Sequence, residues 1–486
     1  MNLRRSATHA AFWGLAQKWG YHAVRLLVFV VLARLLDPAS FGVVALAGVF
    51  VLLGEMLVDQ GFADALVQRT AVGPAHLDSA FWASFAIGVM LTAGCVLFAG
   101  PLAAVFDEPR LAPVLRALGP VLLITSLSRT HEALLRRELA FKRIAKISLA
   151  SVAVGGAAGL WLAMLGYGVW ALVAQLLVQR LVQLPCLWFS VAWRPRLRFS
   201  LPHFRALARF GVNVVGINLL NVANRQADHL LIGYFLGSTV LGYYTVGYRL
   251  IRILLDLLPQ AIMPVAFSAF SRLKAEPVRL REAFYEATRV MALGAFPAFC
   301  GLALLAPAVT EVVFGPQWAP SASVMQVLTA IAALQSISLL CPAALKALGR
   351  PQWVLLITAA NAVANVAAFA IAVHWGIVAV AAAYAVRGYL LWPLTWTALD
   401  RLVSLSPRRY LGALMPALVG CGVMAFAVRG IASGLPGDWG AFARLLALVP
   451  MGAVVYVAAA FTVAPAQCRA LAHQVLQRHP VQEARS

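Results

Sequence analysis

The chain has 486 residues, of which 62% are hydrophobic and only 12% are charged. A soluble globular protein is about 45–50% apolar and about 25% charged, so this composition excludes a soluble globule as well as a disordered or collagen-like chain. It predicts an all-α polytopic membrane protein. In such a protein, the excess of basic residues (39 Lys and Arg against 18 Asp and Glu) does not by itself indicate a nucleic-acid partner.

Fourteen stretches are long and apolar enough to cross the hydrocarbon core as a helix, which takes about 20 residues. In chain order they cover residues 10–33, 41–62, 79–103, 112–130, 147–165, 168–192, 210–235, 241–268, 284–306, 321–345, 353–373, 377–398, 411–430 and 441–463. No connection between them is long enough for a soluble domain. The first six form a predicted N-terminal lobe over 1–200 and the next six a C-terminal lobe over 201–400. The last two belong, with a cytoplasmic tail, to 401–486.

The basic residues fix the predicted orientation. With the N-terminus inside, 25 Lys and Arg fall in cytoplasmic connections and termini, and five fall in outer connections. This positive-inside asymmetry predicts an even number of spans with both chain ends in the cytoplasm. The basic segment from Glu132 to Lys146 also spaces Leu135, Leu139 and Ile144 like an interfacial helix on anionic headgroups.

The sequence contains an internal repeat. Leu32-Ala-Arg-Leu-Leu36, DPAS and Phe41-Gly42 correspond to Ile232-Gly-Tyr-Phe-Leu236, GSTV and Leu241-Gly242, which lie 200 residues later. Ala133–Arg136 matches Ala343–Lys346 at an offset of 210, and Gly168–Leu172 matches Gly376–Val380 at an offset of 208. Each repeat has an even number of spans, so the two halves are predicted to be parallel repeats related by an axis along the membrane normal. Transporters built in this way bind substrate between the halves.

Basic residues inside the spans indicate an anion site. A charge at the bilayer centre costs about 2.5–3.5 kcal/mol, so these residues should face an aqueous cavity or a partner. Arg25 and Arg225 are related by the offset of 200, and Arg180 and Arg387 are nearly equivalent at 208. Guanidinium groups suit the oxygens of phosphate or pyrophosphate. The candidate anion-binding residues are Lys18, Arg25, Arg180, Arg225, Arg249, Arg252 and Arg387.

Acidic residues are fewer in the spans. Arg225 and Asp228 are spaced for a local pair on a helix, and so are Arg252 and Asp256. Four of the cations have no carboxylate within one turn, so we expect a cavity with net positive charge; they are Lys18, Arg25, Arg180 and Arg387. The candidate residues for coupling to an ion gradient are Glu55, Asp59, Asp228 and Asp256.

No motif in the sequence points to catalysis. It contains no His/Glu pair at metal-ligand spacing, no serine-nucleophile motif and no GxxxxGK[ST] phosphate loop. The six cysteines are scattered and lie mostly within the predicted spans. We therefore expect a protein that is not an enzyme and that has no cofactor and no metal site.

Two stretches carry a family pattern. The first runs from Trp13-Gly14 through Leu32–Gly42 to Val58-Asp-Gln-Gly61 and Ala65-Leu-Val-Gln68. The second runs from Arg198-Phe-Ser200 through Phe210-Gly211, Asp228, Ile232-Gly233, Leu236-Gly237 and Leu241-Gly-Tyr-Tyr244 to Pro264-Val-Ala-Phe-Ser268. On these residues the chain resembles the polysaccharide transporter (Wzx-type) family of the MOP superfamily, nearest its colanic-acid and teichuronic-acid exporter branch.

The resemblance implies a flippase that moves polyprenyl-pyrophosphate-linked oligosaccharides across the bacterial inner membrane for exopolysaccharide, O-antigen or capsule synthesis. It also implies alternating access, a lateral opening for the lipid tail and a cationic lumen. Helix position assigns Lys18, Arg25, Arg225, Arg249 and Arg252 to that lumen, and the repeat adds Arg180 and Arg387. The implied partners are the lipid-linked substrate, membrane lipids, and the polysaccharide polymerase and export machinery.

Two other functions stay open. A multidrug or organic-cation antiporter of the same superfamily would need carboxylates facing the cation, yet the first span has none. A membrane glycosyltransferase or polymerase would need catalytic acids or arginines on a large outer loop, and the outer connections here are short.

Overall fold

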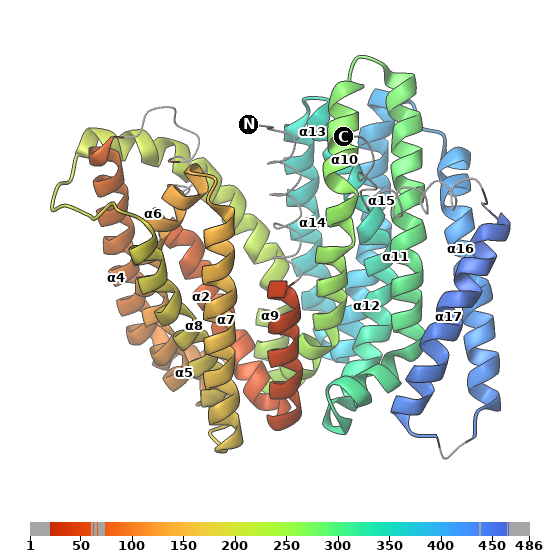
Figure 1. The fold of residues 1–486 in the computed structure, drawn as a ribbon, viewed down its shortest axis with the longest axis horizontal. Coiled ribbons are helices and arrows are strands. Elements are labelled where there is room, and N and C mark those ends of the chain that lie inside the picture. The colour runs from red at the N-terminus through yellow and green to blue at the C-terminus, as the bar shows by residue number, and fades with distance from the viewer. Residues whose placement is uncertain are drawn as a thin grey trace, which may run out of the picture. The chain divides into compact units, whose positions relative to one another are not determined.

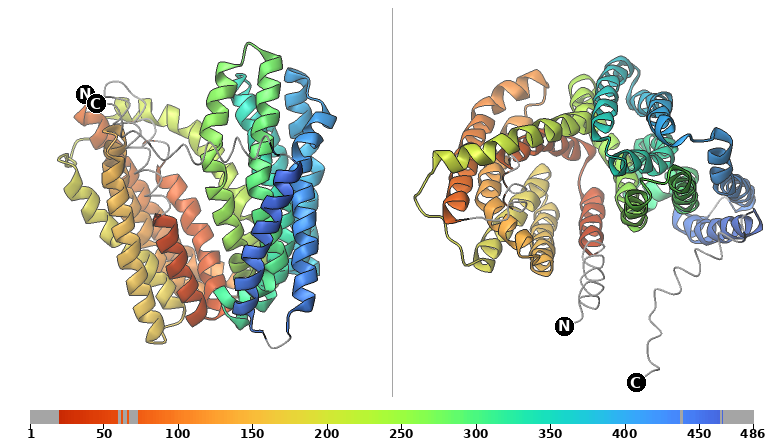
Figure 2. Two further views of the ribbon diagram at one scale, coloured as in Figure 1. Left: turned by 45° about the vertical axis from the view of Figure 1, so that its right-hand side comes forward. Right: turned by 90° about the horizontal axis from the view of Figure 1, so that it is seen from above.

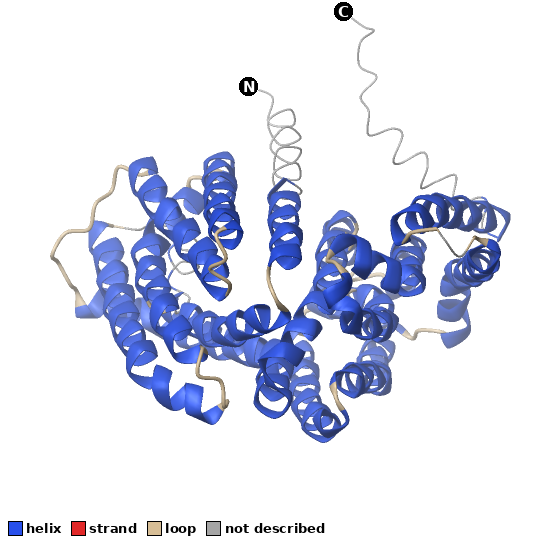
Figure 3. Cartoon of the chain, turned by 90° about the horizontal axis from the view of Figure 1, so that it is seen from below, coloured by secondary structure: helices blue, strands red, loops and turns tan. Residues whose placement is uncertain are grey.

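The computed structural model describes residues 20–59, 62, 66, 73–436, 439–463 and 465 of the chain. In this part of the chain the regular secondary structure is helical throughout, and Figure 3 shows no strand among the described residues. Twelve helices of the described residues are long and apolar enough to cross a membrane. The prediction of an all-α polytopic membrane protein is therefore confirmed.

The helices follow one another with short connections (Figure 1). Residues 20–35 are helical ahead of the first labelled helix. The labelled helices are α2 (Pro38–Asp59), α4 (Pro74–Val105), α5 (Leu111–Leu118), α6 (Pro120–Arg137), α7 (Phe141–Met164), α8 (Val169–Ser190), α9 (Leu201–Leu257), α10 (Met263–Arg272), α11 (Pro277–Val313), α12 (Ala319–Ser338), α13 (Leu340–Ala347), α14 (Pro351–Ala372), α15 (Ile377–Val403), α16 (Pro407–Gly434) and α17 (Ala441–Val463). Single 3-10 turns cover Pro259–Ala261, Pro316–Trp318 and Val373–Trp375.

The twelve candidate helices and the fourteen predicted spans differ at two places. The first predicted span begins at residue 10, and its residues 10–19 lie outside the described part. The predicted spans 210–235 and 241–268 both fall on α9, which bends at Gly237 with a φ of +82° and so has two arms. The predicted span 241–268 is too long, because α9 ends at Leu257 and a 3-10 turn separates it from α10.

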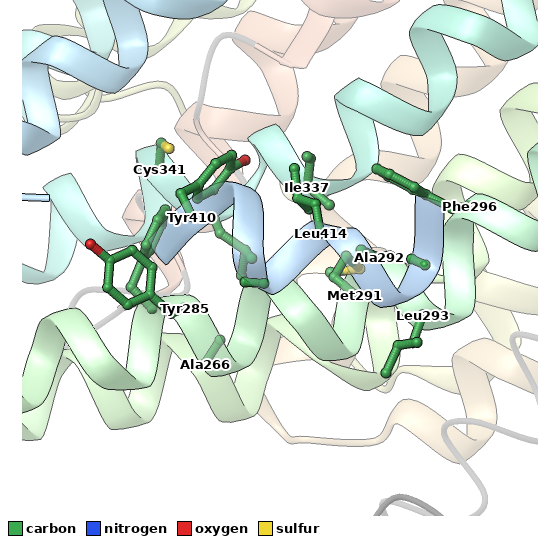
Figure 4. Packing of buried hydrophobic residues seen from close by; sticks show 14 of the residues in the cluster. Ala266, Tyr285, Met291, Ala292, Leu293, Phe296, Ile337, Cys341, Tyr410 and Leu414 are labelled. Carbon is green, nitrogen blue, oxygen red and sulfur yellow. The ribbon is translucent and has the colours of Figure 1, made fainter. Parts of the chain in front are cut away.

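The chain divides into two compact units. The first consists of residues 1–245 and 369–377, and the second of 246–368 and 378–486. The predicted boundary between lobes at residue 200 stays a prediction. In the second unit, buried side chains of α10, α11, α13, α15, α16 and α17 form one hydrophobic cluster, and Figure 4 shows part of it around Met291, Cys341 and Tyr410.

Two corners that the repeat relates meet in the first unit, so closely that only glycine fits. A Cβ atom added to Gly42 would lie closer to the carbonyl oxygen of Ser238 than two non-bonded atoms can approach. A Cβ atom added to Gly242 would meet the carbonyl oxygen of Pro38 in the same way. Positions 38 and 42 correspond to 238 and 242 at the offset of 200, so the contact is reciprocal, as it is at a two-fold interface.

Glu108, in the loop between α4 and α5, connects this loop to the corner at Ser238 by a hydrogen bond. The hydroxyl of Ser238 donates a short hydrogen bond to Glu108 Oε2, and Arg110 Nε donates to Glu108 Oε1 at 3.0 Å. Burial opposes ionisation of the carboxyl, but the hydrogen bonds from Arg110 and Ser238 outweigh it and lower the pKa of Glu108. The ion pair and the hydroxyl therefore stabilise the bend that Gly237 begins.

The repeat also recurs in the turns between helices. Residues with positive φ stand at equivalent places of the two halves, in pairs separated by 208 or 210 residues: Asp107 (φ 47°) with Gly315 (φ 110°), Leu139 (φ 54°) with Gly349 (φ 74°), and Gly168 (φ 55°) with Gly376 (φ 90°). The hydrogen bonds of the second pair match as well. Leu139 N–H donates to Arg136 O and Gly349 N–H to Lys346 O, at 3.1 and 3.0 Å. Local backbone geometry therefore supports the repeat that the sequence predicts.

The turn at Leu139 corrects one expectation. The basic segment from Glu132 to Lys146 is not one interfacial helix, because α6 ends at Arg137 and α7 begins at Phe141. A left-handed residue interrupts a helix, and for leucine this conformation costs about 1–2 kcal/mol. The leucine periodicity that suggested a single helix therefore belongs to two helix ends.

Helix α7 packs closely on α8 (Figure 2). A Cβ atom on Gly155 would lie 2.7 Å from the backbone oxygen of Gln175, and one on Gly159 would lie 2.8 Å from Cβ of Gln175. Small residues allow this approach between membrane helices. Gln183 and Arg180 follow on the same helix, and Arg180 Nη1 donates to Gln183 Oε1 at 3.4 Å.

We predict that Gly42→Ala lowers the thermal stability of the purified protein by at least about 1–3 kcal/mol, because a backbone oxygen occupies the space of the new methyl group. Gly48→Ala is the matched control on α2, since no atom lies within 4 Å of its added Cβ. This control should raise stability by about 1 kcal/mol, the difference in helix propensity between the two residues. Equal effects of the two substitutions in thermal unfolding would contradict the close contact.

The pH dependence of the stability of Glu108→Gln tests whether ionised Glu108 stabilises this corner. A carboxyl whose pKa is lowered on folding stabilises the protein above its ordinary pKa, and this contribution disappears as the pH falls through the lowered value. We therefore expect the variant to unfold at a lower temperature than the wild type at pH 7, with the difference shrinking in acid. A difference that stays constant between pH 7 and pH 3 would show that ionised Glu108 does not stabilise the corner.

Candidate functional site

The first unit neutralises one of its membrane cations with a distant carboxylate. Arg180 Nη2 on α8 donates to Glu55 Oε1 on α2 at 2.6 Å, and Thr125 Oγ1 on α6 donates to the same oxygen at 3.2 Å. The Glu55 side chain is 12% exposed and the Arg180 side chain 33%. The expectation that Arg180 has no carboxylate within one turn holds along its own helix, but the fold supplies one from another helix. Arg180 therefore adds little net positive charge.

The two local ion pairs expected on α9 do not form among the described residues. On the first arm, Asp228 accepts hydrogen bonds from Tyr244 Oη at 2.9 Å and from the backbone N–H of His229 at 2.8 Å, and its side chain is buried. Arg225 is exposed and makes no ion pair with a described carboxylate. The phenol of Tyr244, rather than the guanidinium of Arg225, is therefore the side-chain partner of Asp228.

On the second arm of α9, Arg252 packs on an aromatic ring. Its guanidinium carbon lies 5.4 Å from the centre of the Tyr248 ring, a cation–π contact. Asp256, one turn further, is exposed, and its backbone oxygen accepts a hydrogen bond from Gln260 at 2.6 Å. Arg249 lies one turn before Arg252, so this arm carries two adjacent cations.

The second unit holds Arg387 with neutral groups. Arg387 Nη1 on α15 donates to Asn361 Oδ1 on α14 at 2.5 Å. Its guanidinium carbon lies 5.0 Å from the centre of the Tyr384 ring, and Tyr248 is close enough to interact with it electrostatically. Among the described residues, Arg387 therefore forms no ion pair with a carboxylate.

The structure places the predicted site residues in separate groups. Glu55 and Arg180 lie together in the first unit, as does Asp228 with Tyr244. In the second unit Arg252 packs on Tyr248 and Arg387 on Tyr384, and Arg249 lies on α9 one turn before Arg252. Arg25 is exposed on the helix over 20–35, and Asp59 is the last residue of α2. Lys18 lies outside the described residues.

Six side chains that contact these charges were not predicted: Thr125, Gln183, Tyr244, Tyr248, Asn361 and Tyr384. A usable signal existed, since a polar side chain within an apolar span needs a hydrogen-bond partner. The sequence does not reveal which partner, because helices far apart in the chain supply it. Among the described residues, no group of three or more His, Cys, Asp or Glu could hold a metal ion.

A double-mutant cycle tests the buried pair. We expect Glu55→Gln and Arg180→Gln each to lower stability, and the double variant to lose less than the sum, with a coupling energy of about 1–3 kcal/mol. The exposed pair Glu276 and Arg279, with side chains 49% and 70% exposed, is the matched control and should couple by less than about 1 kcal/mol. Additive losses at Glu55 and Arg180 in chemical unfolding would contradict the interaction.

Comparisons with known proteins agree with this architecture. Residues 31–323 match the family model described as polysaccharide biosynthesis protein. The chain is 31% identical over 324 residues to the succinoglycan biosynthesis transport protein ExoT of Rhizobium meliloti, covering 67% of this chain and 66% of that protein. It is 27% identical over 340 residues to the lipopolysaccharide biosynthesis protein WzxC of Escherichia coli, covering 68% of each. Both matches thus span about two thirds of the relative's length.

Among solved structures, the lipid II flippase MurJ in an inward closed conformation matches with a TM-score of 0.74 and 12% identity, over 96% of this chain and 99% of that one. At this identity the likeness shows a shared fold. Because the family model matches more than half of the sequence, the chain belongs to the family of polysaccharide biosynthesis proteins, and its resemblance to the polysaccharide transporter (Wzx-type) family of the MOP superfamily is confirmed.

Proposed function

We propose that this protein flips polyprenyl-pyrophosphate-linked oligosaccharide units across the bacterial cytoplasmic membrane, by alternating access, for surface polysaccharide synthesis. The family supports the process, and the relative named a transport protein supports transport over catalysis. A fold shared with a protein named a lipid II flippase suits a lipid-linked cargo. In this proposal both chain ends are cytoplasmic, and the polysaccharide polymerase and export machinery receive the product.

One observation carries the proposal: two cations within the spans, Arg252 and Arg387, contact neutral groups. Both pack on aromatic rings, and Arg387 also donates to an amide, which leaves the positive charge in place. An uncompensated cation is costly in the membrane, so it is tolerated where an anionic cargo meets it. A pyrophosphate carries several negative charges, and the adjacent cations Arg249 and Arg252 of α9 match it best.

The remaining cations extend this cationic lumen. Arg25 and Arg225 are equivalent at the repeat offset, and both side chains are exposed. Lys18 is assigned by its place on the first span alone. Arg180 has a smaller part in the proposal, because Glu55 neutralises it.

Ion coupling would act through Glu55, Asp59, Asp228 or Asp256. Glu55 and Asp228 already accept hydrogen bonds from protein groups, so binding of a proton or cation there would have to break those bonds. Those bonds leave neither Glu55 nor Asp228 available for the cargo of an organic-cation antiporter, which needs a carboxylate facing the cation. A glycosyltransferase or polymerase has no support from the family or from the named relatives.

Arg25→Ala and Arg225→Ala test the proposal in cells depleted of the native protein. Neither substitution strands a described carboxylate, so we expect both variants to fold and insert. Each should cut surface polysaccharide about tenfold or more, the loss that follows removal of one charge-assisted contact. Mass spectrometry of membrane lipids should then show accumulated polyprenyl-pyrophosphate oligosaccharide.

Arg279→Ala is the control, because Arg279 pairs with Glu276 at the exposed start of α11. It should restore export fully. An unchanged lipid-linked pool in depleted cells, together with altered tolerance to cationic drugs, would overturn the flippase proposal in favour of the antiporter.

A further inference from the structure

Arg387 lies near the middle of its span. It is ten residues after Ile377, the first residue of α15, which corresponds to about 15 Å along the helix. The hydrocarbon core is about 30 Å thick. A guanidinium at this depth is costly unless its charge and its N–H groups are satisfied.

Neutral neighbours fix the direction in which this guanidinium points. Tyr384, under its face, accepts a hydrogen bond at its hydroxyl from Gln335 Nε2 on α12 at 2.6 Å. Asn361, at its edge, donates with Nδ2 to the backbone oxygen of Ile357 at 2.8 Å. Each group that contacts Arg387 is therefore itself anchored, and the arrangement joins α12, α14 and α15. Such a preorganised donor loses little entropy when a ligand binds.

The charge and part of the hydrogen-bonding capacity remain available. The aromatic neighbours of Arg387 include Tyr384 and Tyr248, and phenols are neutral at pH 7. Its Nε–H is buried and has no hydrogen-bond partner among the described residues. Both facts indicate a site that can bind a negatively charged hydrogen-bond acceptor.

We propose that Arg387, Asn361 and Tyr384 form a subsite for a carboxylate-bearing sugar of the transported oligosaccharide. This inference rests on the proposed function. A planar guanidinium matches the two oxygens of a carboxylate, and one cation balances one carboxylate charge. A pyrophosphate would leave charge uncompensated here, whereas Arg249 and Arg252 lie together on α9. The tyrosine ring and the amide offer an apolar face and polar atoms, which sugar rings also present.

Binding of small probes to the full-length protein in lipid nanodiscs tests the subsite. Affinities for sodium glucuronate, glucose and inorganic pyrophosphate are measured from thermal stabilisation at constant ionic strength. The wild type should bind glucuronate more tightly than glucose. Arg387→Gln should weaken glucuronate binding at least about tenfold while pyrophosphate binding changes less than about threefold. Arg252→Gln should show the reverse, and Arg279→Gln should change neither.

Two results would overturn the subsite. One is a loss of pyrophosphate binding in Arg387→Gln as large as the loss of glucuronate binding, which would assign Arg387 to the pyrophosphate. The other is equal binding of glucuronate and glucose by the wild type. Where Arg387→Gln does not fold, Arg387→Lys keeps the charge without the planar pair of donors and should still weaken glucuronate binding.

These probe measurements separate the inference from the proposed function. Failure of the flippase proposal appears in depleted cells as an unchanged lipid-linked pool. Failure of the subsite appears in the nanodiscs, whatever the cells accumulate.

Discussion

In the first unit, Gly42 and Gly242 lie closely against the backbones of Ser238 and Pro38. Each glycine lies against a carbonyl oxygen of the opposite corner, of Ser238 or of Pro38, so neither corner can move without displacing the other. The bend at Gly237 and the hydrogen bond from Ser238 to Glu108 hold the second corner in place. Because the four positions are related by the repeat offset, one short motif in each half is enough to define how α2 meets the start of the second arm of α9.

In the described spans, the acidic and the basic side chains discussed above have different kinds of partner. Carboxylates are satisfied by protein groups: Glu55 by Arg180 and Thr125, and Asp228 by Tyr244. In the second unit, Arg252 and Arg387 pack on aromatic rings, and Arg387 also donates to an amide; these groups orient a guanidinium and leave its charge in place. The first arrangement stabilises the fold, whereas the second leaves an attraction for anions. The proposed division between pyrophosphate at Arg249 and Arg252 and a sugar carboxylate at Arg387 follows from this contrast.

Much of the architecture could be predicted from the sequence, because long apolar runs and the repeat are local or periodic signals. The positive-φ turns at Gly168 and Gly376 fall where the repeat matches. The prediction of a single interfacial helix was wrong, because Leu139 adopts a left-handed backbone conformation. At the equivalent position of the second half, Gly349 already indicates such a turn in the sequence. The partner of Arg180 lies 125 residues away on α2, and spacing along one helix cannot reveal it. Likewise Tyr244, 16 residues from Asp228, displaced the expected local pair with Arg225.

A flippase of the proposed kind moves a lipid-linked oligosaccharide between leaflets without any other protein. The most direct measurement reconstitutes the purified protein in liposomes that carry a polyprenyl-pyrophosphate oligosaccharide with a labelled sugar in the inner leaflet. A membrane-impermeant glycosidase outside then reports arrival of the sugar at the outer leaflet. We expect cleavage of the labelled sugar beyond the protein-free background, and a loss of that cleavage with Arg25→Ala. Cleavage equal to that of protein-free liposomes, with correctly folded protein present, would contradict it.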